Sequence, residues 1–142
     1  MIITFCGHGN VPDSIKVREW LCNVLDQFIH EENVIFYLGG YGGFDSLAAS
    51  VVRQKKKVNP SAQSVLIIPY LNRTYDKSEY DYTLFPPLET VPPRYAISKR
   101  NKWMVEQADV VIAYVTHGWG GAAKTLEYAR VKKKKLVIYP EI

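Results

Sequence analysis

Three short glycine-rich turns are the residues best suited to chemistry in this sequence. They are Gly7-His8-Gly9, Gly39-Gly40-Tyr41-Gly42-Gly43 and Gly118-Trp119-Gly120-Gly121. Each follows an apolar run and precedes residues at helical spacing, so each is expected to join a strand to a helix. At such a junction, free backbone N–H groups and the positive end of the helix attract an anion. Together the turns favour a phosphate site, although any one of them alone could be a purely structural turn.

Polar and aromatic side chains beside these turns are candidate ligand-binding residues. Asp45 could accept a hydrogen bond from a ribose hydroxyl, or only favour the dipole of its helix. His8 and His117 could act as a general acid or base near neutral pH, or be ordinary loop histidines. Trp119 and Tyr41 could stack on a nucleobase, or pack against a tyrosine-rich segment. The candidate ligand-binding residues from the turns themselves are Gly7, His8, Gly39, Gly40, Gly42, Gly43, Asp45, His117, Trp119, Gly120 and Gly121.

Several common sites are absent from the sequence. The glycine turns match neither G-x-G-x-x-G nor the P-loop pattern, which argues against an ordinary dinucleotide dehydrogenase or NTPase. No G-x-S-x-G motif is present, so a serine hydrolase triad is not expected. Cys6 and Cys22 form no CxxC pair, which favours two reduced thiols in a cytoplasmic protein. The sequence thus predicts no metal and no cofactor.

Strand-like and helix-like stretches alternate along the whole chain. Strands are expected at residues 1–6, 34–38, 64–69, 110–115 and 136–139, and helices at about 15–30, from the second glycine turn to the lysines at 55–57, and at 96–108 and 122–133. This alternation predicts an α/β fold: a single Rossmann-like domain over residues 1–142 whose parallel sheet of about five strands carries helices on both faces. Ligands bind such sheets beyond the carboxyl ends of the strands, where all three glycine turns should lie.

Residues 70–95 depart from this pattern, because they are rich in tyrosine and proline and carry no clear period. A segment of this length inside a compact domain is often a functional loop or lid. A surface excursion packed by its own aromatic side chains is the alternative.

The net charge of +4 is concentrated in the runs Arg53–Lys57 and Lys132–Lys135. Each run falls where a helix is expected to end, and cations are stabilised there by the helix dipole. This placement makes a nucleic-acid partner unlikely and favours an anionic small molecule. No apolar run approaches the roughly 18 residues of a membrane span, and Met1 to Cys6 is typical of a first strand rather than a signal peptide.

Four segments carry a resemblance to a known family. They are Thr4–His8, Gly39–Ala49, Lys99–Val105 and Gly120–Ala129. In combination they resemble the SLOG superfamily of Rossmann-like nucleotide-binding proteins, which includes the "Lonely guy" phosphoribohydrolases, and most closely its small stand-alone YpsA-like branch. The resemblance covers nearly the whole chain. It implies a nucleotide-derived ligand whose phosphate is held by the glycine turns, and a homodimer formed through helices.

The same resemblance implies two catalytic candidates. Arg100 matches an arginine that opens the helix before the fourth strand, and Glu127 has the spacing of the glutamate in GGxGTxxE. In the family these residues act on an N-glycosidic bond, whose cleavage passes through an oxocarbenium-like state that a carboxylate can stabilise. Here Ala123-Lys124 replaces Gly-Thr, and Lys124 could supply a compensating cation.

Three functions therefore follow as hypotheses. The first is binding of a nucleotide or ADP-ribose-like ligand in the glycine-lined pocket. The second is an N-glycosidic-bond hydrolase or transferase that uses Glu127 and Arg100. The third is a nucleic-acid-associated protein served by the lysine runs.

Overall fold

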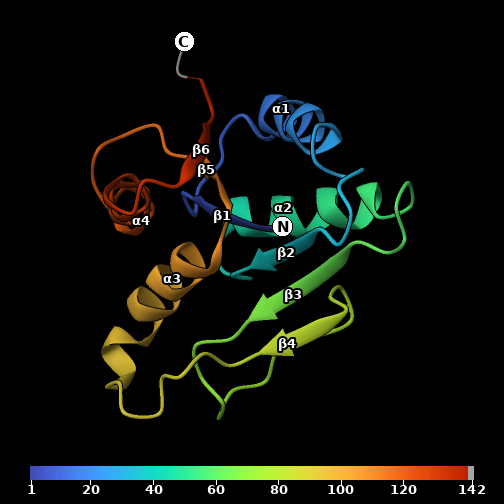
Figure 1. Ribbon diagram of the computed structural model, residues 1–142. Helices are drawn as coiled ribbons and strands as arrows, with labels where there is room; N and C mark the ends of the chain where they lie inside the picture. The colour runs from blue at the N-terminus through green and yellow to red at the C-terminus, as the bar shows by residue number, and fades with distance from the viewer. Residues whose placement is uncertain (141–142) are drawn as a thin grey trace.

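The computed structural model describes residues 1–140, which form one parallel sheet covered by helices on both faces (Figure 1). Within these residues the sheet has six strands in the order β4-β3-β2-β1-β5-β6. The strands are β1 (Ile2–Gly7), β2 (Ile35–Leu38), β3 (Gln63–Ile67), β4 (Tyr82–Leu84), β5 (Val110–Tyr114) and β6 (Lys135–Ile138). The helices are α1 (Ser14–Asp26), α2 (Gly43–Lys55), the 3₁₀ turn η1 (Pro93–Tyr95), α3 (Ala96–Gln107) and α4 (Gly121–Val131). The predicted Rossmann-like α/β class is confirmed.

Strand β4 was not expected from the sequence. It lies inside the Tyr/Pro-rich segment, and pairs with β3 in the register Val65↔Tyr82 to Ile67↔Leu84. Asp81 aligns it, because its carboxylate accepts a 2.8 Å hydrogen bond from the Ser64 amide while its own amide donates to the Ser64 carbonyl. Three residues are too few to display an alternating pattern in the sequence.

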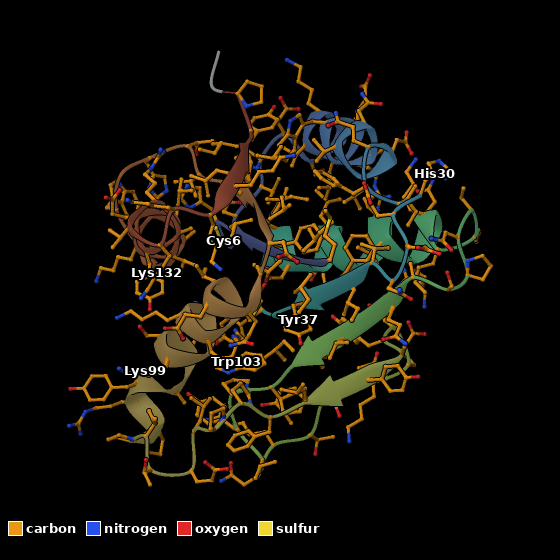
Figure 2. The ribbon with its side chains drawn as sticks, in the orientation of Figure 1. Cys6, His30, Tyr37, Lys99, Trp103 and Lys132 are labelled. Atoms are coloured by element: carbon orange, nitrogen blue, oxygen red, sulfur yellow. The ribbon has the colours of Figure 1, made fainter. Side chains whose placement is uncertain are left out.

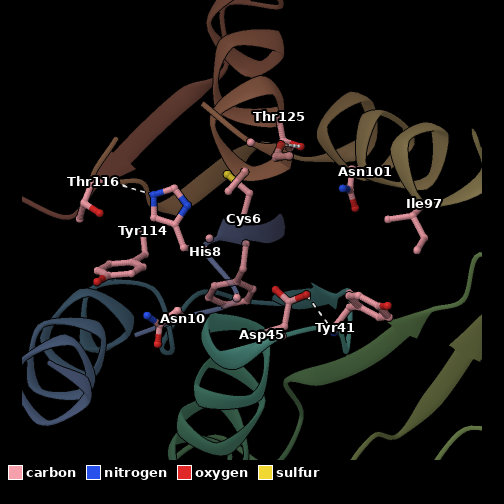
Figure 3. Close-up of a pocket in the computed structure, with 18 of the residues that line it drawn as sticks. Cys6, His8, Asn10, Tyr41, Asp45, Ile97, Asn101, Tyr114, Thr116 and Thr125 are labelled. Atoms are coloured by element: carbon pink, nitrogen blue, oxygen red, sulfur yellow. Dashed lines mark hydrogen bonds between the residues drawn. The ribbon is translucent and has the colours of Figure 1, made fainter. Parts of the chain in front are cut away.

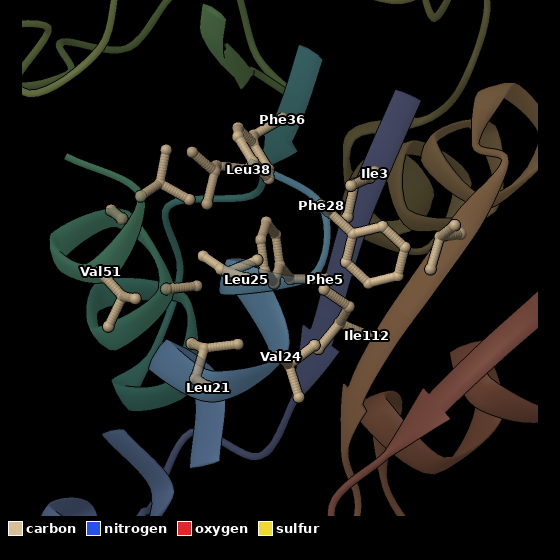
Figure 4. Packing of buried hydrophobic residues seen from close by; sticks show 14 of the residues in the cluster. Ile3, Phe5, Leu21, Val24, Leu25, Phe28, Phe36, Leu38, Val51 and Ile112 are labelled. Atoms are coloured by element: carbon tan, nitrogen blue, oxygen red, sulfur yellow. The ribbon is translucent and has the colours of Figure 1, made fainter. Parts of the chain in front are cut away.

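The two faces of the sheet are buried by different helices. Ile3 and Phe5 of β1 point toward α1 and α2, where they pack with Leu21 and Leu25 (Figure 4). Val111, in β5, points to the opposite face and packs against α3 and α4. Successive strand residues thus alternate between two apolar layers, and each fully buried aliphatic side chain stabilises the fold by about 1.5–3 kcal/mol. On the α3 side, Tyr37 of β2 and Trp103 also stack, with ring centroids 5.7 Å apart (Figure 2).

Helix α1 ends earlier than its apolar spacing predicts. The helix stops at Asp26, although Phe28 and Ile29 beyond it are buried. The amides of Gln27 and Phe28 donate to carbonyls only three residues back, so the last turn tightens and the chain leaves the helix. Among residues 1–140, no helix is long and apolar enough to cross a membrane.

Candidate functional site

A cavity of about 660 Å³ opens at the carboxyl edge of the sheet (Figure 3). All three glycine turns contribute to it, since Gly7, Gly39, Gly42, Gly120 and Gly121 line its wall. The turns therefore converge as expected for strands that run parallel. The cavity is also lined by other candidates from these turns, namely His8, Tyr41, Asp45, His117 and Trp119. Gly40 and Gly43 do not line it.

The N-terminus of α2, which follows the second glycine turn, is occupied by backbone carbonyl groups of the first glycine turn. The amide of Gly43 donates a 2.8 Å hydrogen bond to the Gly9 carbonyl, and the amide of Phe44 donates to the His8 carbonyl. Gly42 has a φ of 94°, and a Cβ atom at this position would lie 3.0 Å from the Cα of Gly9. Glycine is required there because two stretches of backbone touch. The first two amides of α2 hold the first turn in place and are not free to bind an anion.

The N-terminus of α4, in contrast, is open. Gly120, its N-cap residue, has a φ of 93° and provides no side-chain cap. Among residues 1–140, the amides of Gly121, Ala122 and Ala123 have no backbone or side-chain acceptor. A Cβ atom at either Gly120 or Gly121 would meet nothing within 4 Å, so no other part of the described residues crowds this turn. Unpaired amides and the positive helix end make this the anion-attracting wall of the cavity.

Asp45 is a buried carboxylate on the opposite wall. Its side chain is 9% exposed, and its Oδ2 accepts a 3.0 Å hydrogen bond from the Tyr41 amide. Burial raises the pKa of Asp45 to about 6, against the opposing effects of the Tyr41 hydrogen bond and the nearby Arg100 charge. The carboxylate thus remains largely ionised at neutral pH in a site where its charge is costly.

Arg100 is almost completely buried, with 2% of its surface exposed. One guanidinium nitrogen, Nη1, donates to the carbonyls of Gly39 at 2.9 Å and Ile67 at 2.7 Å. Its Nε donates to the side-chain oxygen of Asn101 at 2.9 Å. The side chain reaches the cavity but is anchored to the ends of β2 and β3. Three of its five N–H donors are thereby directed at protein atoms, which favours an architectural role over a phosphate clamp.

Three aromatic rings stack along the α4 side of the cavity. His8 and His117 lie with ring centroids 3.8 Å apart, and His117 and Trp119 with centroids 3.7 Å apart. Nε2 of His8 accepts a 2.9 Å hydrogen bond from the Thr116 amide. Burial lowers the pKa of His8, and the neighbouring His117 lowers it further. Neutral His8 must then carry its proton on Nδ1, the ring nitrogen that faces the cavity in Figure 3.

The two catalytic candidates line different cavities. Glu127 and Lys124 border a second cavity of about 650 Å³, which adjoins the first at Thr116 and His117 and has Arg130 in its wall. The Glu127 side chain is 70% exposed, and its Oε2 lies 3.7 Å from Nε of Arg130. Arg100 borders only the first cavity. Glu127 is therefore a largely exposed residue of α4 that lines the second cavity and not the first.

Asn101 is a cavity residue that was not among the candidates. A signal for it exists in the sequence, because it lies four residues after Ile97 and three before Met104 on the inward stripe of α3. A polar residue in an otherwise apolar helical stripe indicates a buried polar contact.

Comparison with known proteins shows the fold. No family model and no curated protein sequence matches the chain. DNA processing protein A from Streptococcus pneumoniae matches with a TM-score of 0.73 and 16% identity, over 99% of this chain and 50% of that one. The same protein from Helicobacter pylori, described for its single-stranded DNA binding mode, matches with a TM-score of 0.67 and 17% identity, over 100% of this chain and 66% of that one. The molybdenum cofactor carrier protein from Chlamydomonas reinhardtii matches with a TM-score of 0.63 and 15% identity, over 96% of this chain and 75% of that one.

These likenesses, at 15–17% identity, show a shared Rossmann-like fold and no finer relationship. The chain spans about two thirds of the length of the Helicobacter pylori protein and one half of the length of the Streptococcus pneumoniae protein.

The prediction that a nucleic-acid partner is unlikely is wrong. Two of the structural neighbours are DNA processing proteins, and one of them is described as binding single-stranded DNA. The prediction treated the lysines at the end of α4 only as solvated charges near a helix terminus. In the structure Lys132 and Lys102, from the end of α4 and from α3, both lie 5.4 Å from the ring of Tyr128. Lysines from separate elements thus lie around one tyrosine, a pairing that a single sequence run does not reveal.

Proposed function

We propose that this protein binds a nucleotide-like ligand in the carboxyl-edge cavity, with its phosphate at the N-terminus of α4. The observation that carries the proposal is the contrast between two helix ends. The amides that open α2 are occupied by His8 and Gly9, whereas those of Gly121 and Ala122 face the cavity without an acceptor among residues 1–140. A phosphate would accept from these amides and lie at the positive end of the helix.

The remainder of the cavity suits the rest of a nucleotide. Its volume of about 660 Å³ lies within the range of roughly 300–1,000 Å³ that is common for small-molecule sites. Tyr41 and Trp119 line it and are 69% and 72% exposed, so each offers an aromatic surface for a base. The net charge of +4 favours an anionic ligand.

A pair of substitutions in one helical turn tests the phosphate position. Ala122 lines the first cavity and Ala123 the second, and both lie in the first turn of α4. Glutamate in a first turn is compatible with the helix dipole, so both variants should fold. Calorimetric titration with AMP and with inorganic phosphate should show binding to wild type and Ala123→Glu, and a loss of at least tenfold in Ala122→Glu. Equal affinities in the two variants would place the phosphate elsewhere.

A second candidate function is binding of single-stranded nucleic acid. Support comes from the DNA processing protein neighbours and from Lys102 and Lys132, which both lie beside the Tyr128 ring. Binding of a labelled oligo(dT) should then weaken steeply with salt. Substitution of Lys102 and Lys132 by Ser should reduce the salt slope by about 1.4, because each lysine would neutralise one phosphate and a single strand contributes about 0.7 per phosphate. An affinity that does not change with salt excludes this candidate.

Membership of the YpsA-like branch stays a proposal, supported by the same glycine motifs. The N-glycosidase alternative gains no support from the geometry, because Arg100 and Glu127 border separate cavities. Substitution of Glu127 by Gln should leave AMP binding unchanged.

A further inference from the structure

Asp45 is an unusual residue to find in the wall of this cavity. A carboxylate that is nine-tenths buried normally has an ion-pair or several hydrogen bonds. Here Oδ2 accepts one hydrogen bond, from the Tyr41 amide, and among residues 1–140 no donor contacts Oδ1. The nearby Arg100 guanidinium donates to carbonyls and to Asn101 rather than to Asp45. The carboxylate therefore keeps an accepting oxygen in the cavity wall.

Gly39 allows this arrangement. A Cβ atom at position 39 would lie 2.8 Å from Oδ2 of Asp45 and 3.3 Å from Nη2 of Arg100. Only glycine leaves space for both charged groups beside the end of β2. Because position 39 has no side chain, the Asp45 carboxylate and the buried Arg100 guanidinium can both lie beside it at the cavity wall.

Asn101 complements Asp45 with a donor. Its side-chain oxygen accepts from Nε of Arg100 at 2.9 Å, so the orientation of the amide is fixed. The amide nitrogen is then left as a donor, and Figure 3 shows Asn101 and Asp45 reaching toward the cavity from α3 and α2. Arg100 thus acts as a positioning residue, because it holds Asn101 and neutralises part of the charge of Asp45.

The chemistry of this end of the cavity indicates the kind of group it would bind. The free carboxylate oxygen of Asp45 requires a donor, and the Asn101 amide nitrogen requires an acceptor. The hydroxyl groups of a sugar supply both. A ligand cation fits less well, since it would be buried beside the guanidinium of Arg100. Adjacent sugar hydroxyls can engage the carboxylate without adding charge.

We infer that Asp45 and Asn101 form a subsite for sugar hydroxyl groups, through which the cavity distinguishes a ribonucleotide from its 2′-deoxy counterpart. This inference rests on the proposed function, because the phosphate at α4 sets the place of the sugar. A site built to bond a hydroxyl rejects an analogue without it, since its own polar groups are left unpaired.

Matched pairs of nucleotides test the inference. Calorimetric titration at pH 7.5 would use AMP against dAMP and CMP against dCMP, so that each pair differs only by the 2′-hydroxyl. Wild type should bind the ribonucleotide at least tenfold more tightly in both pairs. Asp45→Asn should reduce the preference to less than threefold while inorganic phosphate binds as in wild type. Asn101→Ala should also reduce the preference, and Ser98→Ala, an exposed position on the same helix, should not.

The outcomes separate the two proposals. Nucleotides that bind with no preference for the ribose form would overturn the hydroxyl subsite and leave the phosphate site standing. A preference that persists in Asp45→Asn would also overturn it. If neither nucleotides nor phosphate bind, the proposed function fails, and the hydroxyl subsite with it.

Discussion

The imidazole rings of His8 and His117 stack face to face, with centroids 3.8 Å apart and planes inclined by 13°. His8 is fixed as a hydrogen-bond acceptor by the Thr116 amide, and Trp119 covers the other side of His117. A proton added to Nε2 of His8 would remove that acceptor and place a charge against a neighbouring ring. The α4 side of the cavity is therefore organised around a neutral His8.

The first prediction concerns the stability of the fold in mild acid. The pKa of His8 is lowered below its ordinary value of 6.5 in the folded protein, so the unfolded chain takes up its proton first as the pH falls. The stability that neutral His8 contributes is fully present above pH 6.5 and is lost as the pH falls below 6.5 through the lower pKa of the folded protein. His8→Gln retains an acceptor for Thr116 without titrating. Urea midpoints measured from pH 7.5 to 5.5 should fall more steeply for wild type than for His8→Gln.

His30 provides the control, because it is exposed and distant from the cavity. The urea midpoint of His30→Gln at pH 7.5 should match that of wild type. A pH dependence in His8→Gln as steep as that of wild type would show that other groups cause the acid sensitivity.

The second prediction concerns Asp45, whose ionisation changes the stability of the fold with pH in the direction opposite to that of His8. The pKa of Asp45 is raised from 3.8 to about 6, so the folded protein holds the proton more tightly than the unfolded chain. Stability is therefore lost as the pH rises from about 4 to 6, and the loss persists above pH 6. Since Asn can accept the Tyr41 hydrogen bond without a charge, Asp45→Asn should be more stable than wild type at pH 8 by roughly 1–3 kcal/mol.

The gap between Asp45→Asn and wild type should close near pH 4, where both side chains are neutral in the folded protein. Because the comparison is made at each pH, the contribution of His8 cancels. Chemical denaturation at pH 4, 6 and 8 measures this difference in the free energy of unfolding between the variant and wild type. A variant less stable than wild type at pH 8 would mean that the carboxylate stabilises the fold, and the idea that a binding function retains it would lose its support.

The order of the elements was predictable because apolar strands and amphipathic helices leave periodic patterns. The convergence of the glycine turns followed from the parallel sheet alone, since parallel strands place the following turns at one edge. Strand β4 was not predictable, because three residues with Tyr82 at their start show no period. Helix ends were uncertain by several residues, as at Phe28 and Ile29, where buried side chains continue past the end of α1.

The character of the site depended on long-range contacts that residue types do not encode. The turn at Gly42 and the turn at Gly120 have similar composition and nearly equal φ values of 94° and 93°. They differ because the carbonyls of His8 and Gly9 reach α2 and not α4. Which helix end remains open was therefore visible only in three dimensions. The same holds for Arg100, whose partners come from the ends of β2 and β3.

The third prediction concerns the close approach of Gly7 to α2. A Cβ atom at this position would lie 2.3 Å from Cδ2 of Phe44, whose ring is fully buried. Gly7→Ala should therefore destabilise the protein by about 1–3 kcal/mol, because the core must shift to accept a methyl group. At Gly9 a Cβ atom would meet nothing within 4 Å, so Gly9→Ala should retain or slightly raise the urea midpoint. Equal midpoints for the two variants would contradict this account of the β1 turn.

The last prediction separates two roles for Arg100. The buried carbonyls of Gly39 and Ile67 depend on its Nη1, and each would be left without that donor in Arg100→Met. Because an unsatisfied buried polar group costs about 1–3 kcal/mol, this variant should lose roughly 2–4 kcal/mol of stability. Lys99→Met, an exposed neighbour on the same helix, should stay close to wild type. A phosphate clamp would behave differently, since Arg100→Met would then keep its urea midpoint and lose affinity for inorganic phosphate. That result would assign Arg100 to the ligand, whereas a lower midpoint with retained phosphate affinity assigns it to the framework that positions Asn101 and Asp45.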